Sequence, residues 1–107
     1  MKHTILGNTV ELFFNKQKQE FRNIVPKFDF PTQIFVTTRW VNDILIWENE
    51  ESLKLIQQMV FSYVITEIKE RAKEEKLDYL QKVTINWNKC WLIDDGSHIC
   101  LMLPSEY

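Results

Sequence analysis

The pattern that most constrains the fold of this chain is a long run of apolar residues at helical spacing between Glu50 and Lys76. Asn49 precedes the run and can cap a helix, and Glu50 and Glu51 suit the positive end of a helix dipole. The apolar stripe consists of Leu53, Ile56, Val60, Val64, Ile68 and Ala72. It is widened by Leu55, Met59, Phe61 and Tyr63. We therefore expect a helix over about residues 50–76 that is covered on more than one side.

The C-terminal third is rich in β-branched and aromatic residues, which favour strands. Its pattern predicts three strands, over residues 79–87, 90–94 and 97–103. Asp95-Gly96 separates the last two, and this dipeptide favours a two-residue hairpin turn. A further strand is expected over Gln33–Val41. The predicted fold class is α+β, with an antiparallel sheet of about four strands and the long helix on one face.

The N-terminal region admits two interpretations. Asn8 followed by Glu11 has the spacing of a capping box, and a helix over residues 9–24 would end before Pro26. Its apolar positions at helical spacing are Val10, Phe13, Phe14, Phe21 and Ile24. The alternative is a hairpin, with strands Thr4–Leu6 and Thr9–Leu12 around Gly7-Asn8. We favour the helix, which makes residues 1–107 a single domain with a helical extension over 1–30 and an α+β core over 33–107.

The expected hairpin also assigns the faces of the sheet. With Asp95 and Gly96 as the turn, Asp94 opposes Ser97 and Trp91 opposes Cys100. Because side chains alternate along a strand, one face carries Cys90, Leu92, Ile99, Leu101 and Leu103. The other face carries Trp91, Ile93, His98, Cys100 and Met102. The two cysteines then lie on opposite faces, which excludes a disulfide or a shared metal, and the N-terminal helix is expected to cover most of the second face.

Several function classes conflict with this sequence. The only two glycines, Gly7 and Gly96, are too far apart for a phosphate-binding loop. No apolar run approaches the ~20 residues of a membrane-spanning helix, and the N-terminus does not resemble a signal peptide. A zinc site built from the cysteines, His3 and His98 would need ligands from both faces of the sheet. We therefore expect a cytoplasmic protein with no metal or cofactor.

Surface binding is the function class that the remaining residues favour. Four tryptophans exceed what a core of this size needs, and tryptophan is enriched in binding hot spots. The candidate anchors are Trp40, Trp47, Trp91 and His98, with a charged complement to a basic partner formed by Asp43, Glu48, Glu50 and Glu51. One alternative is nucleic-acid binding through Lys16, Lys18, Arg22 and Arg39, which a pI near 5.7 disfavours. A second alternative is a small enzyme in which His98 acts as general base.

Four segments resemble a small uncharacterised family of proteins known mainly from staphylococci and their mobile elements. They are Phe35–Asp43, Leu55–Phe61, Leu77–Gln81 and Pro104–Tyr107. The resemblance covers residues 34–107, and Asp78-Tyr79-Leu80-Gln81 is its most specific part. The chain departs from the family by some thirty extra N-terminal residues, an insertion near residues 44–48, and Trp40 in place of glycine.

The resemblance implies a phage or mobile-element setting in a bacterial host, and it assigns no catalytic residues. Small accessory proteins of such elements often bind and disable a host enzyme. We therefore expect a non-enzymatic binding protein that inhibits a host defence enzyme by protein–protein contact. Its sharpest version is an anti-CRISPR-type inhibitor of an RNA-guided nuclease.

Overall fold

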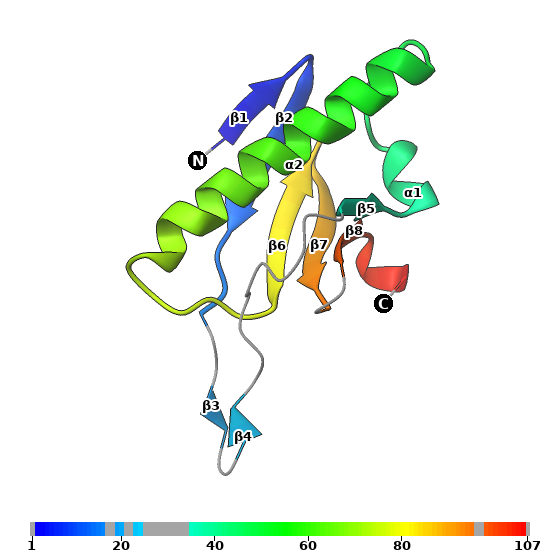
Figure 1. Ribbon diagram of the computed structural model, residues 1–107. Coiled ribbons are helices and arrows are strands. Elements are labelled where there is room, and N and C mark those ends of the chain that lie inside the picture. The colour runs from blue at the N-terminus through cyan, green and yellow to red at the C-terminus, as the bar shows by residue number, and fades with distance from the viewer. Residues whose placement is uncertain (1, 17–18, 21–22, 25–34, 96–97, 107) are drawn as a thin grey trace.

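The computed structural model describes residues 2–16, 19–20, 23–24, 35–95 and 98–106. The described residues form a six-stranded sheet and one long helix, α2, that lies across one side of it (Figure 1). The elements in chain order are β1 (Lys2–Ile5), β2 (Asn8–Phe13), β3 (Gln19–Glu20), β4 (Asn23–Ile24), β5 (Phe35–Thr37), α1 (Arg39–Asn42), α2 (Glu50–Ala72), β6 (Leu80–Ile85), β7 (Asn88–Asp94), β8 (Ile99–Met102) and the 3-10 helix η1 (Pro104–Glu106).

The predicted α+β class is confirmed, whereas the expected sheet of four antiparallel strands is wrong in detail. The strand order is β1-β2-β6-β7-β8-β5, and β3 and β4 form a separate pair. The edge strand β5 runs parallel to β8 while the other neighbours in the large sheet are antiparallel, so that sheet is mixed. The helix crosses between the parallel strands, as a parallel connection requires.

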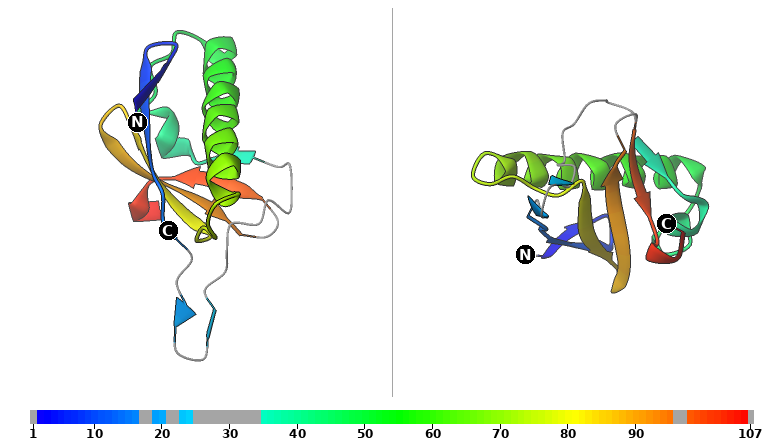
Figure 2. Two further views of the ribbon diagram at one scale, coloured as in Figure 1. Left: turned by 90° about the vertical axis from the view of Figure 1, so that its left-hand side faces the viewer. Right: turned by 90° about the horizontal axis from the view of Figure 1, so that it is seen from below.

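The core lies between α2 and the sheet face that we call the inner face (Figure 2). The buried helix residues are Ile56, Val60, Phe61, Val64, Ile65 and Ile68. They face apolar residues of the inner face, among them Val10, Leu12, Val83, Ile85, Cys90, Leu92, Ile99 and Leu101. Each fully buried aliphatic side chain contributes roughly 1.5–3 kcal/mol relative to exposure.

The helix start is confirmed, because the Ser52 amide donates to Asn49 Oδ1 at 2.9 Å and Ser52 closes a capping box. The helix ends at Ala72 rather than near Lys76.

The expected N-terminal helix over residues 9–24 is wrong, and the alternative hairpin is confirmed. Val10 and Leu12 are buried in the inner face, while Glu11 and Phe13 point to the opposite side, which is the two-residue period of a strand. The turn is Leu6-Gly7 rather than Gly7-Asn8, because Ile5 pairs with Asn8. Gly7 has a φ of 85°, a conformation that suits glycine. Phe21 and Pro26 lie outside the described residues.

The C-terminal strands pair as expected, but their register differs by two residues. Trp91 pairs with Met102 instead of Cys100, and Asp94 pairs with Ile99 instead of Ser97. Because β7 ends at Asp94 and β8 begins at Ile99, four residues connect the strands. Within this connection the Asp95 carboxylate accepts from the His98 amide at 2.8 Å, and Gly96 and Ser97 lie outside the described residues. Because side chains alternate between the faces with a period of two, a slip of two residues leaves every side chain on its predicted face. The placement of Cys90 and Cys100 on opposite faces is therefore confirmed.

The strand expected over Gln33–Val41 is wrong beyond Thr37. Thr38 ends the parallel pairing, since its amide donates to the Leu101 carbonyl at 3.0 Å. Its hydroxyl donates to Glu106 Oε1 at 2.7 Å, which fixes the point where the chain turns. The short helix α1 follows and buries Val41, so Trp40 belongs to a helix rather than to the sheet. Gln33 lies outside the described residues.

Candidate functional site

Three connections meet at one end of the sheet: the β1–β2 turn, residues 43–49 between α1 and α2, and the β6–β7 turn (Figure 1). The fully buried side chain of Asn8 joins the first two. Its Oδ1 accepts from the Ile46 amide at 2.7 Å, and its Nδ2 donates to the Ile46 carbonyl at 3.1 Å. The amide of Asn8 therefore pairs with the backbone of Ile46 as a neighbouring strand would.

Asn86 joins the third connection to the other two, and we call the pair of side chains Asn8 and Asn86 the Asn8–Asn86 bracket. Its Nδ2 donates to Asn8 Oδ1 and to the Ile44 carbonyl, both at 2.8 Å, and its Oδ1 accepts from the Thr9 amide at 2.9 Å. Breaking such part-buried bonds leaves polar groups unsatisfied, at a cost of about 1–3 kcal/mol per group. The two asparagines thus hold three separate loops as one unit.

This end of the molecule displays large apolar side chains to solvent. We call it the aromatic end and define it by Leu6, Trp40, Ile46, Trp47 and Trp87, which are between 42% and 73% exposed. The indole of Trp47 donates to the Asn42 carbonyl at 3.1 Å, which holds its ring beside α1. Single exposed apolar residues are ordinary, whereas a group of them at one place is typical of an interaction surface.

Two members of the aromatic end lie in strained turns. Leu6 has a φ of 45° and Trp87 a φ of 70°, next to Asn86 at 50°. A left-handed conformation costs a residue with a Cβ roughly 1–2 kcal/mol, and tight hairpin turns of this kind favour glycine in the second central position. Trp87 is also the most exposed of the large apolar residues, at 73%. Strain combined with exposure of an aromatic ring favours a functional role over a stabilising one.

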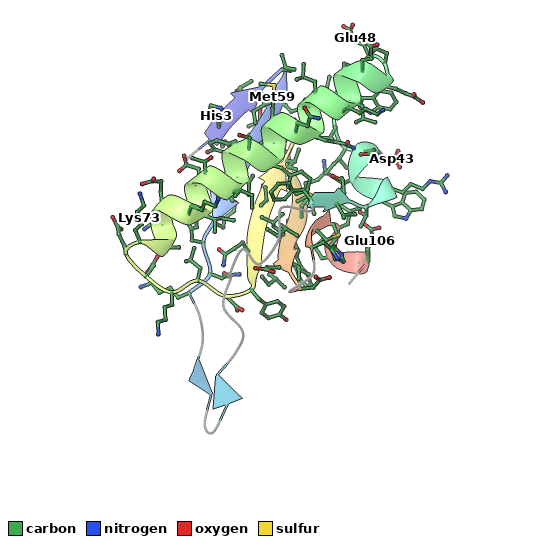
Figure 3. All side chains as sticks on the ribbon, in the orientation of Figure 1. His3, Asp43, Glu48, Met59, Lys73 and Glu106 are labelled. Carbon is green, nitrogen blue, oxygen red and sulfur yellow. The ribbon has the colours of Figure 1, made fainter. Side chains whose placement is uncertain are left out.

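Carboxylates accompany the aromatic end. Residues 39–51 contain Asp43, Glu48, Glu50 and Glu51 but only one basic residue, Arg39. Figure 3 shows Asp43 directly after α1 and Glu48 before the start of α2. None of the four carboxylates forms an ion pair with another residue that the structure describes. This end is therefore both apolar and negatively charged.

The structure brings together most of the predicted partner-binding residues, but not all of them. Trp40, Trp47 and the four carboxylates share the aromatic end. Trp91 lies in the middle of β7, on the side of the sheet away from α2. His98 lies in the β7–β8 connection, where its Nε2 is 3.1 Å from Asp95 Oδ2. The predicted surface is thus divided between separate places.

Sequence reasoning missed Trp87 as a member of this site. It assigned Trp87 to the end of a strand over residues 79–87, whereas β6 ends at Ile85. Asn86 was the available signal, because asparagine tolerates the left-handed conformation of a hairpin turn.

The chemistry of the cysteines does not favour nucleophilic catalysis. Burial, and secondarily Glu106, raises the pKa of Cys90 to about 12. Burial also raises the pKa of Cys100, with smaller contributions from Asp95 and Glu106. The reactive form of cysteine is the thiolate, and both groups are protonated at neutral pH. Within the described ranges, no three His, Cys, Asp or Glu side chains are arranged to hold a metal ion.

Of the basic residues proposed for nucleic-acid binding, the structure describes Lys16 and Arg39. Lys16 Nζ lies 3.3 Å from Glu75 Oε2, near the end of α2. The Arg39 guanidinium lies 5.7 Å from the ring centroid of Trp40 on α1. Lys18 and Arg22 lie outside the described residues. The two placed members thus belong to different parts of the molecule.

Comparison with protein-family models, curated proteins and solved structures finds no match to this chain. Among the described helices, none combines the length and apolar character needed to cross a membrane.

Proposed function

We propose that this chain is a non-enzymatic binding protein that docks its aromatic end onto another protein. The observation that carries the proposal is the display of Trp87, 73% exposed, on a strained turn that the Asn8–Asn86 bracket holds in place. Tryptophan is prominent among residues that dominate binding energy. A rigid display also reduces the conformational entropy lost on association.

The partner chemistry follows from the charge of this end. Asp43, Glu48, Glu50 and Glu51 outnumber the basic residues near them, Arg39 and Lys54, and none of the four is ion-paired with another described residue. A partner that offers an apolar pocket rimmed by lysine or arginine would complement them. Such pairing accelerates association and weakens as salt is added.

The mobile-element setting implied by the family resemblance suggests which basic partner this is. We propose a host defence enzyme, and specifically an RNA-guided nuclease, which holds nucleic acid in positively charged channels. An acidic, aromatic surface is suited to occupying such a channel, so the protein would act as an anti-CRISPR-type inhibitor in the bacterial cytoplasm.

The direct test is cleavage of a target DNA by purified RNA-guided nucleases from bacterial hosts, with increasing amounts of this protein. We expect inhibition by the wild type and a loss of about 30-fold in potency for Trp87→Ala, the size of a hot-spot substitution. Met59→Ala is the matched control, because Met59 is also exposed, at 38%, but lies in the middle of α2 (Figure 3). Equal potency of Trp87→Ala and Met59→Ala would contradict the assignment of the site.

The charge contribution is tested separately with the double variant Glu50→Gln, Glu51→Gln. We expect slower association at low salt and a smaller dependence of the association rate on salt. A nuclease panel that shows neither binding nor inhibition by the wild type would refute the inhibitor proposal.

A further inference from the structure

The side of the sheet away from α2, which we call the outer face, is built from β1, β2, β6, β7 and β8. The N-terminal helix expected to cover it is a hairpin within the same sheet, and the long helix lies on the opposite side (Figure 2). Among the described elements, η1 lies beside β7 and the long helix α2 packs on the inner face. No long helix of the part of the chain that the structure describes therefore covers the outward side chains of the central strands.

The strand registers place four outer side chains in one row across the sheet. Phe13 pairs with Lys82, Lys82 with Trp91, and Trp91 with Met102. Lys82 on β6 thus stands between Phe13 on β2 and Trp91 on β7, the two strands that flank β6. The row borders a shallow cavity of about 620 Å³. Its lining includes Phe13, Lys82, Thr84, Lys89, Trp91 and Pro104.

The outer face is basic although the chain as a whole is acidic. The outward positions of β1, β2, β6 and β7 carry Lys2, Lys82 and Lys89 against a single carboxylate, Glu11. Lys2 Nζ lies 4.2 Å from the ring centroid of Trp87. Neither Lys82 nor Lys89 is ion-paired with another described residue. This face has the opposite charge to the aromatic end, so the two surfaces suit different ligands.

We propose that the outer face binds single-stranded nucleic acid, with bases stacked on Phe13 and Trp91 and phosphates held by Lys82 and Lys89. Aromatic rings interleaved with cations on an open sheet provide both contacts that a single strand offers. An acidic protein partner would use the lysines but would not need the rings. This site is separate from the aromatic end and does not depend on the function proposed for that end.

The spacing of the row favours a single strand over a duplex. Neighbouring strands lie about 4.8 Å apart, so Phe13 on β2 and Trp91 on β7 are roughly 10 Å apart. Stacked bases in a duplex follow one another at about 3.4 Å. Only an unstacked, extended strand can place one base on each ring.

The test is fluorescence anisotropy of the full chain with labelled twelve-nucleotide oligo-dT and oligo-U at 50 mM salt, with a duplex of equal length as competitor. We expect saturable binding of at least one of the single strands, which distinguishes DNA from RNA, and weak competition by the duplex. Phe13→Ala should weaken binding about 5-fold or more. Phe13 is the better ring to remove, because it is 48% exposed and contributes little to the core.

The lysines are tested through the salt dependence. Each phosphate contact contributes a slope of about −0.7 to the plot of log affinity against log salt for single strands. The double variant Lys82→Gln, Lys89→Gln should therefore reduce the slope by about 1.4. Lys54→Gln is the control for net charge, because Lys54 lies on α2, on the other side of the sheet. Since it removes no phosphate contact, it should reduce the slope by less than about 0.3.

Three outcomes would overturn the proposal. They are the absence of single-strand binding by the folded wild type at 50 mM salt, competition by the duplex as strong as by the single strand, and full affinity in Phe13→Ala with loss only in the lysine variants. The last outcome would indicate a general anionic surface such as an acidic protein. Trp87→Ala should retain oligonucleotide binding, which keeps this result distinct from that of the nuclease assay.

Discussion

Replacing Trp87 by glycine should give a more stable protein than replacing it by alanine. Trp87 has a φ of 70° and follows Asn86 at 50° in the β6–β7 turn. Both substitutions remove the ring and its contact with Lys2, so those losses cancel in the comparison. What remains is the strain of the left-handed conformation, roughly 1–2 kcal/mol for alanine and absent for glycine. Glycine loses about 0.5–1 kcal/mol through the greater freedom of its unfolded chain, which leaves on the order of 0.7 kcal/mol in its favour.

The measurement is urea denaturation followed by far-UV circular dichroism, with the free energy of unfolding of both variants extrapolated to water. The control pair is Thr84→Gly and Thr84→Ala within β6, where glycine should be the less stable by about 0.5–1 kcal/mol. Opposite signs at the two positions are the expected result. A Trp87→Ala variant at least as stable as Trp87→Gly would refute the reasoning, because the turn would then impose no strain on a side chain.

Three further predictions concern the turns, the bracket and the thiols. Gly7→Ala should lower the free energy of unfolding by roughly 1–2 kcal/mol in the same assay, from backbone strain alone, since an added Cβ at φ 85° meets no atom within 4 Å. Asn86→Ala should cost about 1–3 kcal/mol, and Asn88→Ala is its control because Asn88 donates only within its own turn. An equal loss in both would contradict the bracket. The raised pKa of Cys90 favours the neutral thiol in the folded state, so stability should fall as pH rises above about 9, by on the order of 1 kcal/mol per pH unit. Cys90→Ala should show a flatter decline between pH 9 and 10.5, and identical slopes would argue against the burial of this thiol.

The parts of the fold that local patterns determine were predictable. The stripe from Leu53 to Ile68 and the Asn49 cap specify α2 without reference to the rest of the chain. The faces of β7 and β8 were also predicted, although the turn between them was assigned two residues too short. A slip of two residues returns every side chain to its own face, so the separation of Cys90 from Cys100 did not depend on the exact turn.

The N-terminal segment shows where local pattern is insufficient. Over residues 8–13 the apolar positions fit a helical period as well as a strand, and Asn8 with Glu11 matches a capping box. The outcome depends on β6, because Val10 and Leu12 pair with Ile85 and Val83. That partner lies about seventy residues further along the chain, and a short window of sequence contains no information about it.

The candidate site was predictable to a similar degree. The aromatic and acidic residues between Trp40 and Glu51 are close in sequence, so their shared location required no knowledge of the fold. Trp87 joins them only through Asn86, which bonds to Asn8 across 78 positions. The outer face was identified as an apolar face with one histidine, but its lysines lie on β6 and at the start of β7, which the hairpin argument did not include.

The N-terminal hairpin, whose segment was predicted as a helix, connects the two proposed surfaces. Its turn supplies Leu6 to the aromatic end, and Asn8 stabilises that end through hydrogen bonds to Ile46. Phe13, at the other end of β2, belongs to the outer face. Asn8 acts through side-chain bonds to Ile46 and Asn86, while Phe13 is positioned by the backbone pairing of β2 with β6. Loss of the Asn8 amide therefore loosens the loops that carry Ile46 and Trp87 and leaves the Phe13–Lys82–Trp91 row in register. Because each surface depends on different bonds of one strand, either can change without the other, as two independent binding functions would require.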